Sequence, residues 1–325
     1  MPKVSVVIPV YNVEAYIERC LHSLFGQTLD DIEYVFVDDG STDGSAEIIE
    51  RVLEQYKDSP PRKNRREQTK ILHHDRNRGV AAARTTGIRA ATGDYIIHCD
   101  ADDWVERDMY EKLYSEAVRT DSDIVACYFW YENPKYKYQF TNCYGPTPHR
   151  CLKDMYRKKC LYQNLWDKLV RREIITRHDI VPFEGLDYGE DLNCVVRIFY
   201  YSRTISVVGE PLYHYRRHAN SMMGLPADKE ILKKHMRNVD LICDFLHRES
   251  GRRYEQFCDH MKFCLKRDYQ HLLYDDEREW FDLYHECYRH VLSFNMFPLR
   301  SRLIIWLAMR NFRLYRIMRR MFYDI

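Results

Sequence analysis

The alternation of apolar, strand-like runs with helical patterns over the first 130 residues limits the possible folds of this chain more than any other feature. Strand-like segments lie at 4–10, 32–37, 70–74, 94–99 and 123–131. Between them, apolar residues recur at helical spacing at 12–24, after Thr42 and at 79–91. Strands alternating with helices predict a largely parallel α/β sheet. Ligands of such sheets bind at the carboxyl ends of the strands, so the residues directly after each strand are the functional candidates.

The pattern changes after about residue 150, where helical spacing dominates. We expect helices at 152–162, 166–177 and 189–201, a short strand pair around 204–216, and then helices at 228–248, 252–273, 277–292 and 300–322. The sequence therefore predicts two parts, an α/β domain over 1–221 and a helical C-terminal region over 222–325.

Charge and cysteine content exclude several classes of protein. The chain has 50 Lys and Arg against 49 Asp and Glu, which argues against a uniformly basic protein that binds nucleic acid. The longest apolar run, 303–309, is too short to span a bilayer. The N-terminus lacks a signal-peptide pattern, and the eleven scattered cysteines include no CxxC pair. These features predict a cytoplasmic protein with reduced thiols.

The segments after the first two strands carry candidate nucleotide contacts. Pro9 and Tyr11 follow the first strand, where neither a GxGxxG turn nor a P-loop is present. Tyr11 can stack on a planar base, although an ordinary turn explains this segment equally well. Asp38 and Asp39 follow the second strand and can accept hydrogen bonds from a base N–H or from ribose hydroxyls. Turn chemistry and helix capping explain part of that acidic segment.

The segments after the third and fourth strands suggest a phosphate and a cation. Arg84 lies one helical turn beyond the expected helix start at Gly79, which suits a phosphate, whereas a solvent-exposed arginine is the commoner outcome. Asp100 and Asp102 point to the same side of an extended backbone. Two carboxylates aimed at one point repel each other unless a cation or proton intervenes, so they suit a hard divalent ion; an acidic turn is the alternative.

Three further groups lie in the second half of the chain. Trp166 and Lys168 place an aromatic ring beside a cation. Glu190 and Asp191 open a helix, a position that also favours acids through the helix dipole alone. A cluster after the short strand pair can meet a diphosphate or a metal and contains Arg216 and His218.

Taken in order, these segments form a recognisable set. The motifs VSVVIPVYN, VDDGSTDGS, NRGVAAARTTG and YIIHCDADDW, with WDKL and GEDL downstream, resemble those of the bacterial family 2 glycosyltransferases of polysaccharide assembly, which have a GT-A fold. The resemblance covers about residues 3–221, and the ordered set is far more specific than any single motif. It implies a GT-A catalytic domain that transfers a sugar from a nucleotide-sugar donor, usually a UDP-sugar, with inversion at the anomeric carbon.

The resemblance also implies roles for the individual residues. Asp191 would be the general base, with Glu190 beside it. Asp102 would be the more direct ligand of Mn²⁺ or Mg²⁺, with Asp100 as the second acid. The nucleotide-binding set would comprise Pro9, Tyr11, Asp38, Asp39, Arg84 and Asp100, with Arg84 near the phosphates. Contacts to the donor or acceptor would come from Trp166, Lys168, Glu190, Arg216 and His218.

The chain departs from the family pattern at two places. The family often has Asn after the arginine of the third motif, where this chain has Thr85 and Thr86, and Cys99 replaces a frequent Leu before the acidic motif. Neither change removes a group that the mechanism needs. Two alternatives remain: a nucleotidyltransferase, which would need a Gly-rich basic loop that PVYNVEAY lacks, and a non-catalytic nucleotide-sugar-binding protein, which would not need the acids at 100, 102 and 191.

The C-terminal segment is strongly basic. Residues 299–325 contain seven Arg and one Asp. If 300–322 form one helix, Arg302, Arg313, Arg316 and Arg320 share one side of it, roughly opposite an apolar side. This pattern predicts peripheral contact with anionic lipid at the cytoplasmic face of a membrane, and with it a lipid-linked glycan acceptor. A packed terminal helix with a solvated arginine face is the alternative.

Overall fold

The computed structural model describes residues 1–57, 64–133, 135–155, 163–218, 228–269, 272, 277–295 and 297–321. The chain forms two compact units. The first comprises 1–149 and 162–225, and the second comprises 150–161 and 226–325. The boundary predicted between 221 and 222 lies outside the described residues and stays a prediction.

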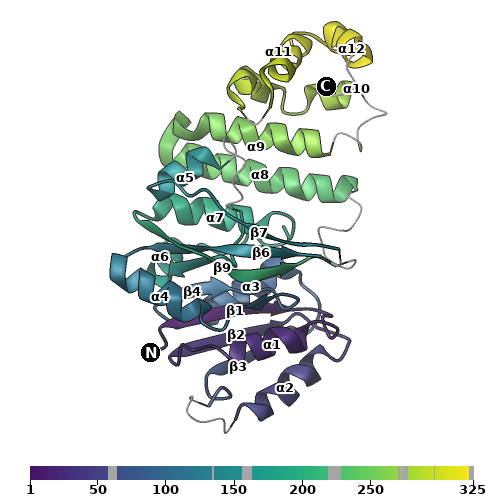
Figure 1. Ribbon diagram of the computed structural model, residues 1–325. Helices are drawn as coiled ribbons and strands as arrows, with labels where there is room; N and C mark the ends of the chain where they lie inside the picture. Colours follow the sequence, from purple (N-terminus) through teal and green to yellow (C-terminus); the bar gives the residue numbers. More distant parts are fainter. Residues whose placement is uncertain are drawn as a thin grey trace. The chain divides into compact units, whose positions relative to one another are not determined.

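A nine-stranded sheet, drawn in Figure 1, forms the centre of the first unit, with the order β3-β2-β1-β4-β8-β6-β9-β5 and β7 paired with β6. The strands are β1 Val4–Val10, β2 Ile32–Asp38, β3 Thr69–His73, β4 Tyr95–His98, β5 Trp104–Val105, β6 Ile124–Glu132, β7 Lys137–Phe140, β8 Lys168–Arg171 and β9 Ile205–Arg216. The first four strands are parallel, as are β6 and β9, while β8 runs antiparallel between β4 and β6. The predicted mostly parallel α/β sheet is confirmed.

Helices cover both faces of this sheet. Helices α1 Ile17–Phe25, α2 Ser45–Gln55 and α4 Met109–Thr120 share a core with Val6 and Ile8 of β1. Helix α3 Val80–Ala90 packs on β1 and β2, where Ala83 meets Val35 and Val37. A side chain on Gly87 of α3 would collide with Val7, so glycine permits the close approach of helix and strand. The first unit also contains α6 Arg172–Arg177 and α7 Glu190–Tyr201, while α5 Pro148–Asp154 crosses from the first unit into the second.

Two predictions in the middle of the chain are wrong in detail. Residues 168–171 form strand β8, and only 172–177 of the predicted helix over 166–177 are helical. A short apolar run such as this cannot be assigned from periodicity, because its state depends on the neighbouring strands. The predicted strand pair around 204–216 is the single strand β9, whose register against β6 shifts between Cys127 and Phe129. Strands β5 and β7 and helix α4 were not predicted.

The second unit is helical. It contains α8 Lys229–Ser250, a 3₁₀ turn at Gly251–Tyr254, α9 Glu255–Asp268, α10 Glu277–Asp282, a 3₁₀ segment at His285–Ser293, α11 Leu299–Ala308 and α12 Phe312–Met321. Helices α8 and α9 pack along each other (Figure 1). The buried polar residues of α9 include Asp259 and Lys266. Asp259 accepts hydrogen bonds from Arg289 and His290, and the Lys266 ammonium donates to the carbonyls of Phe281 and Leu283.

The single helix predicted over 300–322 is wrong, because the chain breaks between α11 and α12. Asn311 precedes α12, and its side chain accepts a hydrogen bond from the Leu314 N–H, as a helix cap does. With the helix interrupted, the shared face predicted for Arg302 and the later arginines does not hold. Arg302 donates to the Asn295 side chain at 2.9 Å, and the Arg320 side chain lies outside the described part. Among the described helices, none is long and apolar enough to cross a membrane.

Candidate active site

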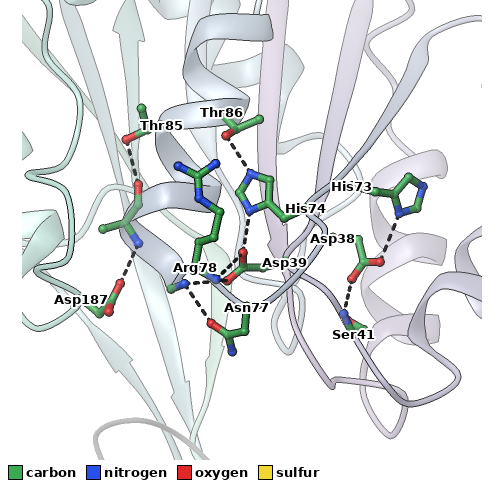
Figure 2. A network of polar contacts seen from close by, with 12 residues as sticks. Asp38, Asp39, Ser41, His73, His74, Asn77, Arg78, Thr85, Thr86 and Asp187 are labelled. Carbon is green, nitrogen blue, oxygen red and sulfur yellow. Dashed lines mark hydrogen bonds and ion pairs between the residues drawn. The ribbon is translucent and has the colours of Figure 1, made fainter.

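Asp39 joins the end of β2 to the start of α3. Its carboxylate is buried and accepts hydrogen bonds from the backbone N–H groups of Arg78 at 3.0 Å and Gly79 at 2.8 Å. Figure 2 shows Asp39 between this backbone and His74, whose Nδ1 lies 2.6 Å from Asp39 Oδ1. The other nitrogen of the same imidazole lies 2.9 Å from the Thr86 hydroxyl. The predicted nucleotide contact is therefore held in one orientation by the loop between β3 and α3, with Thr86 of α3 bonded to His74.

Asp38 and Tyr11 lie at the same end of the sheet as Asp39. Asp38 Oδ1 accepts the Ser41 N–H at 2.9 Å, and its Oδ2 lies 3.2 Å from His73. Although burial raises the pKa of Asp38, the hydrogen bonds from Ser41 and His73 outweigh it and lower the pKa overall. Tyr11 is 44% exposed beyond the end of β1, and Pro9 is half-buried within that strand. Tyr11 thus presents the ring that a base can stack on.

Asp187 ties the loop before α7 to the start of α3, a connection that sequence reasoning missed. Its Oδ1 accepts the Ala81 N–H at 3.1 Å (Figure 2). Gly79 has φ +90°, and any side chain there would collide with the Asp187 carboxylate. Asp187 stands in no recognisable motif, so only the folded chain reveals this contact.

Arg84 of α3 links three acidic side chains from distant segments. It is 2% exposed, and its guanidinium lies 2.9 Å from Asp100, 3.5 Å from Asp191 and 3.5 Å from Glu190. Burial lowers the pKa of Arg84, but the three carboxylates, Asp191 most strongly, outweigh it and raise the pKa. The guanidinium therefore stays charged in a buried position. The predicted approach of Arg84 to phosphates remains a prediction.

Glu190 and Asp191 have different environments although they are neighbours at the start of α7. Burial and then the charge of Asp191 raise the pKa of Glu190 to about 8, so Glu190 is largely protonated at neutral pH. Burial also raises the pKa of Asp191, and the charge of Arg84 reduces this rise without cancelling it. The Leu165 N–H donates to Asp191 Oδ2 at 3.3 Å. Among the described residues, Asp191 Oδ1 has no hydrogen-bond partner. The Arg84 guanidinium thus favours the ionised form of Asp191.

Asp102 lies beside residues from the end of β9. The His218 Nε2 is 2.8 Å from Asp102 Oδ2, and the imidazole stacks on Tyr16 with ring centroids 4.1 Å apart. The Arg216 guanidinium lies over the same tyrosine at 5.0 Å. Arg216 and His218 thus lie beside the acidic motif, and their contact with donor or acceptor remains a prediction.

Asp103, which the sequence analysis gave no role, anchors β9 to the acidic loop. Its carboxylate accepts hydrogen bonds from the Tyr213 hydroxyl and the Arg216 N–H, both at 2.7 Å. Burial and the neighbouring charges of Asp102 and Asp100 raise the pKa of Asp103 well above its usual value. In the sequence, Asp103 is marked only by its place as the third acid of the run DADD.

Trp166 and Lys168 are both buried. The Lys168 ammonium donates to Asp167 and to the Asn164 carbonyl, both at 2.6 Å. Trp166 stacks on Tyr213 with ring centroids 4.2 Å apart. Their predicted contacts with donor or acceptor remain predictions.

The acids at 100 and 102 fit a divalent cation by their chemistry. No group of three or more His, Cys, Asp or Glu side chains arranged for a metal is found in the described part of the chain. Asp100 is paired with Arg84, but burial and the charge of Asp100 raise the pKa of Asp102 more than His218 lowers it, so a further cation would favour the ionised form of Asp102. Carboxylate oxygens are ligands that Mg²⁺ and Mn²⁺ accept, and donor phosphates commonly complete such sites.

Comparison with solved structures identifies the class of fold. The crystal structure of residues 1–349 of Staphylococcus aureus TarS matches with a TM-score of 0.68 at 17% identity, covering 97% of this chain and 91% of that one. The mixed α/β sheet with a helical C-terminal region is thus a GT-A-type fold.

The family follows from the sequence match. The model of glycosyl transferase family 2 matches residues 5–175. The Bacillus subtilis proteins EpsH and EpsJ, both named as glycosyltransferases, are 35% and 33% identical and cover 68% and 70% of this chain. This chain spans 63% and 64% of their lengths, somewhat under two thirds. The chain belongs to the family 2 glycosyltransferases.

Proposed function

We propose that the chain is an inverting glycosyltransferase that moves a sugar from a UDP-sugar to a hydroxyl of a glycan or lipid-linked glycan. The observation that carries the proposal is the position of Arg84. One buried guanidinium contacts Asp100 of the acidic motif and lies 3.5 Å from Asp191, about ninety residues further along the chain. The proposed metal site and the proposed base therefore share one small volume at the carboxyl ends of the strands.

The nucleotide would bind where β1 and β2 end. Tyr11 offers an exposed ring for the base, with Pro9 beneath that end of β1, and Asp39 and Asp38 offer fixed carboxylate acceptors. TarS has been solved in complex with UDP and with UDP-GlcNAc, and these structures match this chain with TM-scores of 0.63 and 0.62. This likeness in fold supports the choice of a uridine nucleotide.

The leaving diphosphate requires positive charge. Asp102, with Asp100 beside it, would hold Mn²⁺ or Mg²⁺. When bound, such a cation offsets the negative charge that develops as the sugar–phosphate bond breaks. His218 contacts Asp102, the Arg216 guanidinium lies over the same Tyr16 ring on which His218 stacks, and both would contact the phosphates or the cation.

Asp191 would act as general base. The acceptor oxygen attacks the anomeric carbon from the face opposite the nucleotide, and its proton passes to Asp191 as the new bond forms. Asp191 Oδ1 is the oxygen without a hydrogen-bond partner among the described residues. Glu190 cannot serve equally, because a carboxyl with a pKa of about 8 already carries a proton at neutral pH.

Donor binding and transfer are tested separately. Thermal shift with a panel of UDP- and GDP-sugars, in Mn²⁺ and in EDTA, should show metal-dependent stabilisation by a UDP-sugar. Asp191→Asn should keep that stabilisation and lose transfer, whereas Asp102→Asn should lose the dependence on Mn²⁺. Near-normal turnover by Asp191→Asn would show that the base is assigned wrongly.

The proposal also includes a location at the membrane. On α11, Leu299, Leu303 and Leu307 recur every fourth residue and are 59%, 43% and 44% exposed, next to a segment rich in arginine. This exposed stripe replaces the continuous helix face as support for contact with anionic lipid at the cytoplasmic face of the membrane. Liposomes containing anionic lipid should float the full chain but not a chain that ends at residue 298. Equal flotation of both forms rules the contact out.

A further inference from the structure

A row of four tyrosine rings, the aromatic platform, lies on one face of β6, β7 and β9. Its members are Tyr131, Tyr136, Tyr138 and Tyr215. Tyr131 and Tyr138 stack with centroids 5.0 Å apart and planes 20° apart, and Tyr136 lies 5.8 Å from Tyr138 at 25°. Tyr215 completes the row, 5.7 Å from Tyr131. Three of the rings are thus close to parallel.

Strand pairing builds this row. Tyr131 of β6 lies opposite Tyr138 of β7 in an antiparallel pair and opposite Tyr215 of β9 in a parallel pair, so all three side chains project from one face. The turn after β6 adds Tyr136, because the Asn133 side chain accepts the Tyr136 N–H at 2.9 Å. The ring positions are therefore fixed by the backbone.

The outer end of the platform is exposed, in contrast to a core cluster. Tyr136 is 54% exposed and Tyr138 is 42% exposed. Exposing neighbouring stacked rings sacrifices the burial that normally stabilises aromatic side chains. Such a surface is typical of a binding site.

The inner end of the platform reaches the proposed base. Tyr215 lies 5.9 Å from Trp166, with the two ring planes 9° apart. The residue before this tryptophan, Leu165, donates its N–H to Asp191. The row therefore runs outward from the Asp191 side of the site, the side on which an acceptor hydroxyl must arrive. The proposed base and ribose contacts lie on other strands, at the ends of β1 and β2.

We propose that the aromatic platform binds pyranose rings of the glycan acceptor. The C–H groups on a sugar face can pack flat on an aromatic ring, while the hydroxyls at the sugar edge remain free to bond polar neighbours. Arg217, exposed and 3.3 Å from the Tyr131 hydroxyl, and Lys135 at the turn supply donors at the rim. This inference rests on the proposed glycosyl transfer and identifies the acceptor as a carbohydrate chain that extends along β6 and β7.

The test measures glycan binding without a donor. Wild type and Tyr136→Ala/Tyr138→Ala are applied to an array of hexose, N-acetylhexosamine and uronic acid oligosaccharides. Each lost ring should weaken binding about fivefold, so the double variant should lose most of its signal. Tyr138→Phe keeps the ring and should bind like wild type, and Val118→Ala is a matched control at an exposed apolar position on α4.

Donor-dependent readouts separate this inference from the proposed function. The double variant should keep the thermal shift produced by UDP-sugars and Mn²⁺, because the platform is not part of the proposed nucleotide site. Absence of glycan binding by wild type, or equal binding by the double variant, overturns the platform proposal even if UDP-sugars still bind. Failure of UDP-sugars to bind, with glycan binding intact, would instead count against the proposed function.

Discussion

Replacing Glu190 by glutamine and Asp191 by asparagine should have opposite consequences for catalysis, although the two acids are adjacent in sequence. Burial and the Asp191 charge raise the pKa of Glu190 to about 8. At pH 7 the protonated form then exceeds the ionised form about tenfold. Glutamine has nearly the shape and charge of that protonated carboxyl. Glu190→Gln should therefore keep turnover within a few-fold of wild type at pH 7.

Asp191→Asn should remove the group that accepts the proton from the acceptor hydroxyl. General-base catalysis contributes about 10²- to 10⁴-fold, and turnover should fall by that factor. The assay is release of UDP from a UDP-sugar in the presence of acceptor, with donor binding checked by thermal shift. A large loss in Glu190→Gln with near-normal turnover in Asp191→Asn would refute the assignment of the two protonation states.

The same pair gives a signed pH dependence of stability. The folded-state pKa of Glu190 lies above its usual 4.5, so between about 4.5 and 8 the folded chain retains a proton that the unfolded chain has released. The contribution of Glu190 to the free energy of unfolding is fully present below this pH window and is lost as the pH rises through it. In urea unfolding, the free energy of unfolding should fall less between pH 5 and pH 8 for Glu190→Gln than for the wild type. An unchanged slope would contradict the raised pKa.

Two further predictions concern polar groups outside the acid pair. Thr86→Val removes the hydroxyl bonded to His74, so the imidazole that contacts Asp39 is no longer fixed; the change should cost about 1 kcal/mol of stability and weaken UDP binding. The control is Thr85→Val, because the Thr85 hydroxyl bonds the Ala81 carbonyl of its own helix. Equal effects of the two changes in calorimetry would show that the Thr86–His74 contact does not support UDP binding. Burial lowers the pKa of Lys266 to about 7, so stability should rise between about pH 7 and 10.5 by up to about 1.4 kcal/mol per pH unit from this group. Lys266→Met should remove that slope in urea unfolding; the same slope in both proteins would show that the ammonium is not desolvated.

Strands β1, β2 and β4 could be predicted because each is a largely apolar run buried on both faces, as Val6 and Val7 of β1 illustrate. Position at a strand end also singled out Asp100, whose carboxylate lies 2.9 Å from the Arg84 guanidinium. These inferences needed only local patterns and the geometry of a parallel sheet.

Features set by tertiary contacts could not be predicted in the same way. Strand β8 owes its state to pairing with β4 and β6, and the break before Phe312 depends on one asparagine cap within an otherwise helical pattern. Asp187 and Asp103 bond to segments far away in sequence, so no local spacing marks them. The acidic surroundings of Arg84 likewise became visible only when α3, β4 and α7 were placed together.

The stereochemistry of the product tests the central claim most directly. A donor with an α-linked UDP-sugar, incubated with Mn²⁺ and a glycan that binds the platform, gives a product whose anomeric configuration can be read by proton NMR. Direct attack by an acceptor hydroxyl deprotonated by Asp191 predicts a β-linked product, absent when Asp191→Asn replaces the wild type. An α-linked product, or the same transfer by Asp191→Asn, would contradict single displacement with Asp191 as the base.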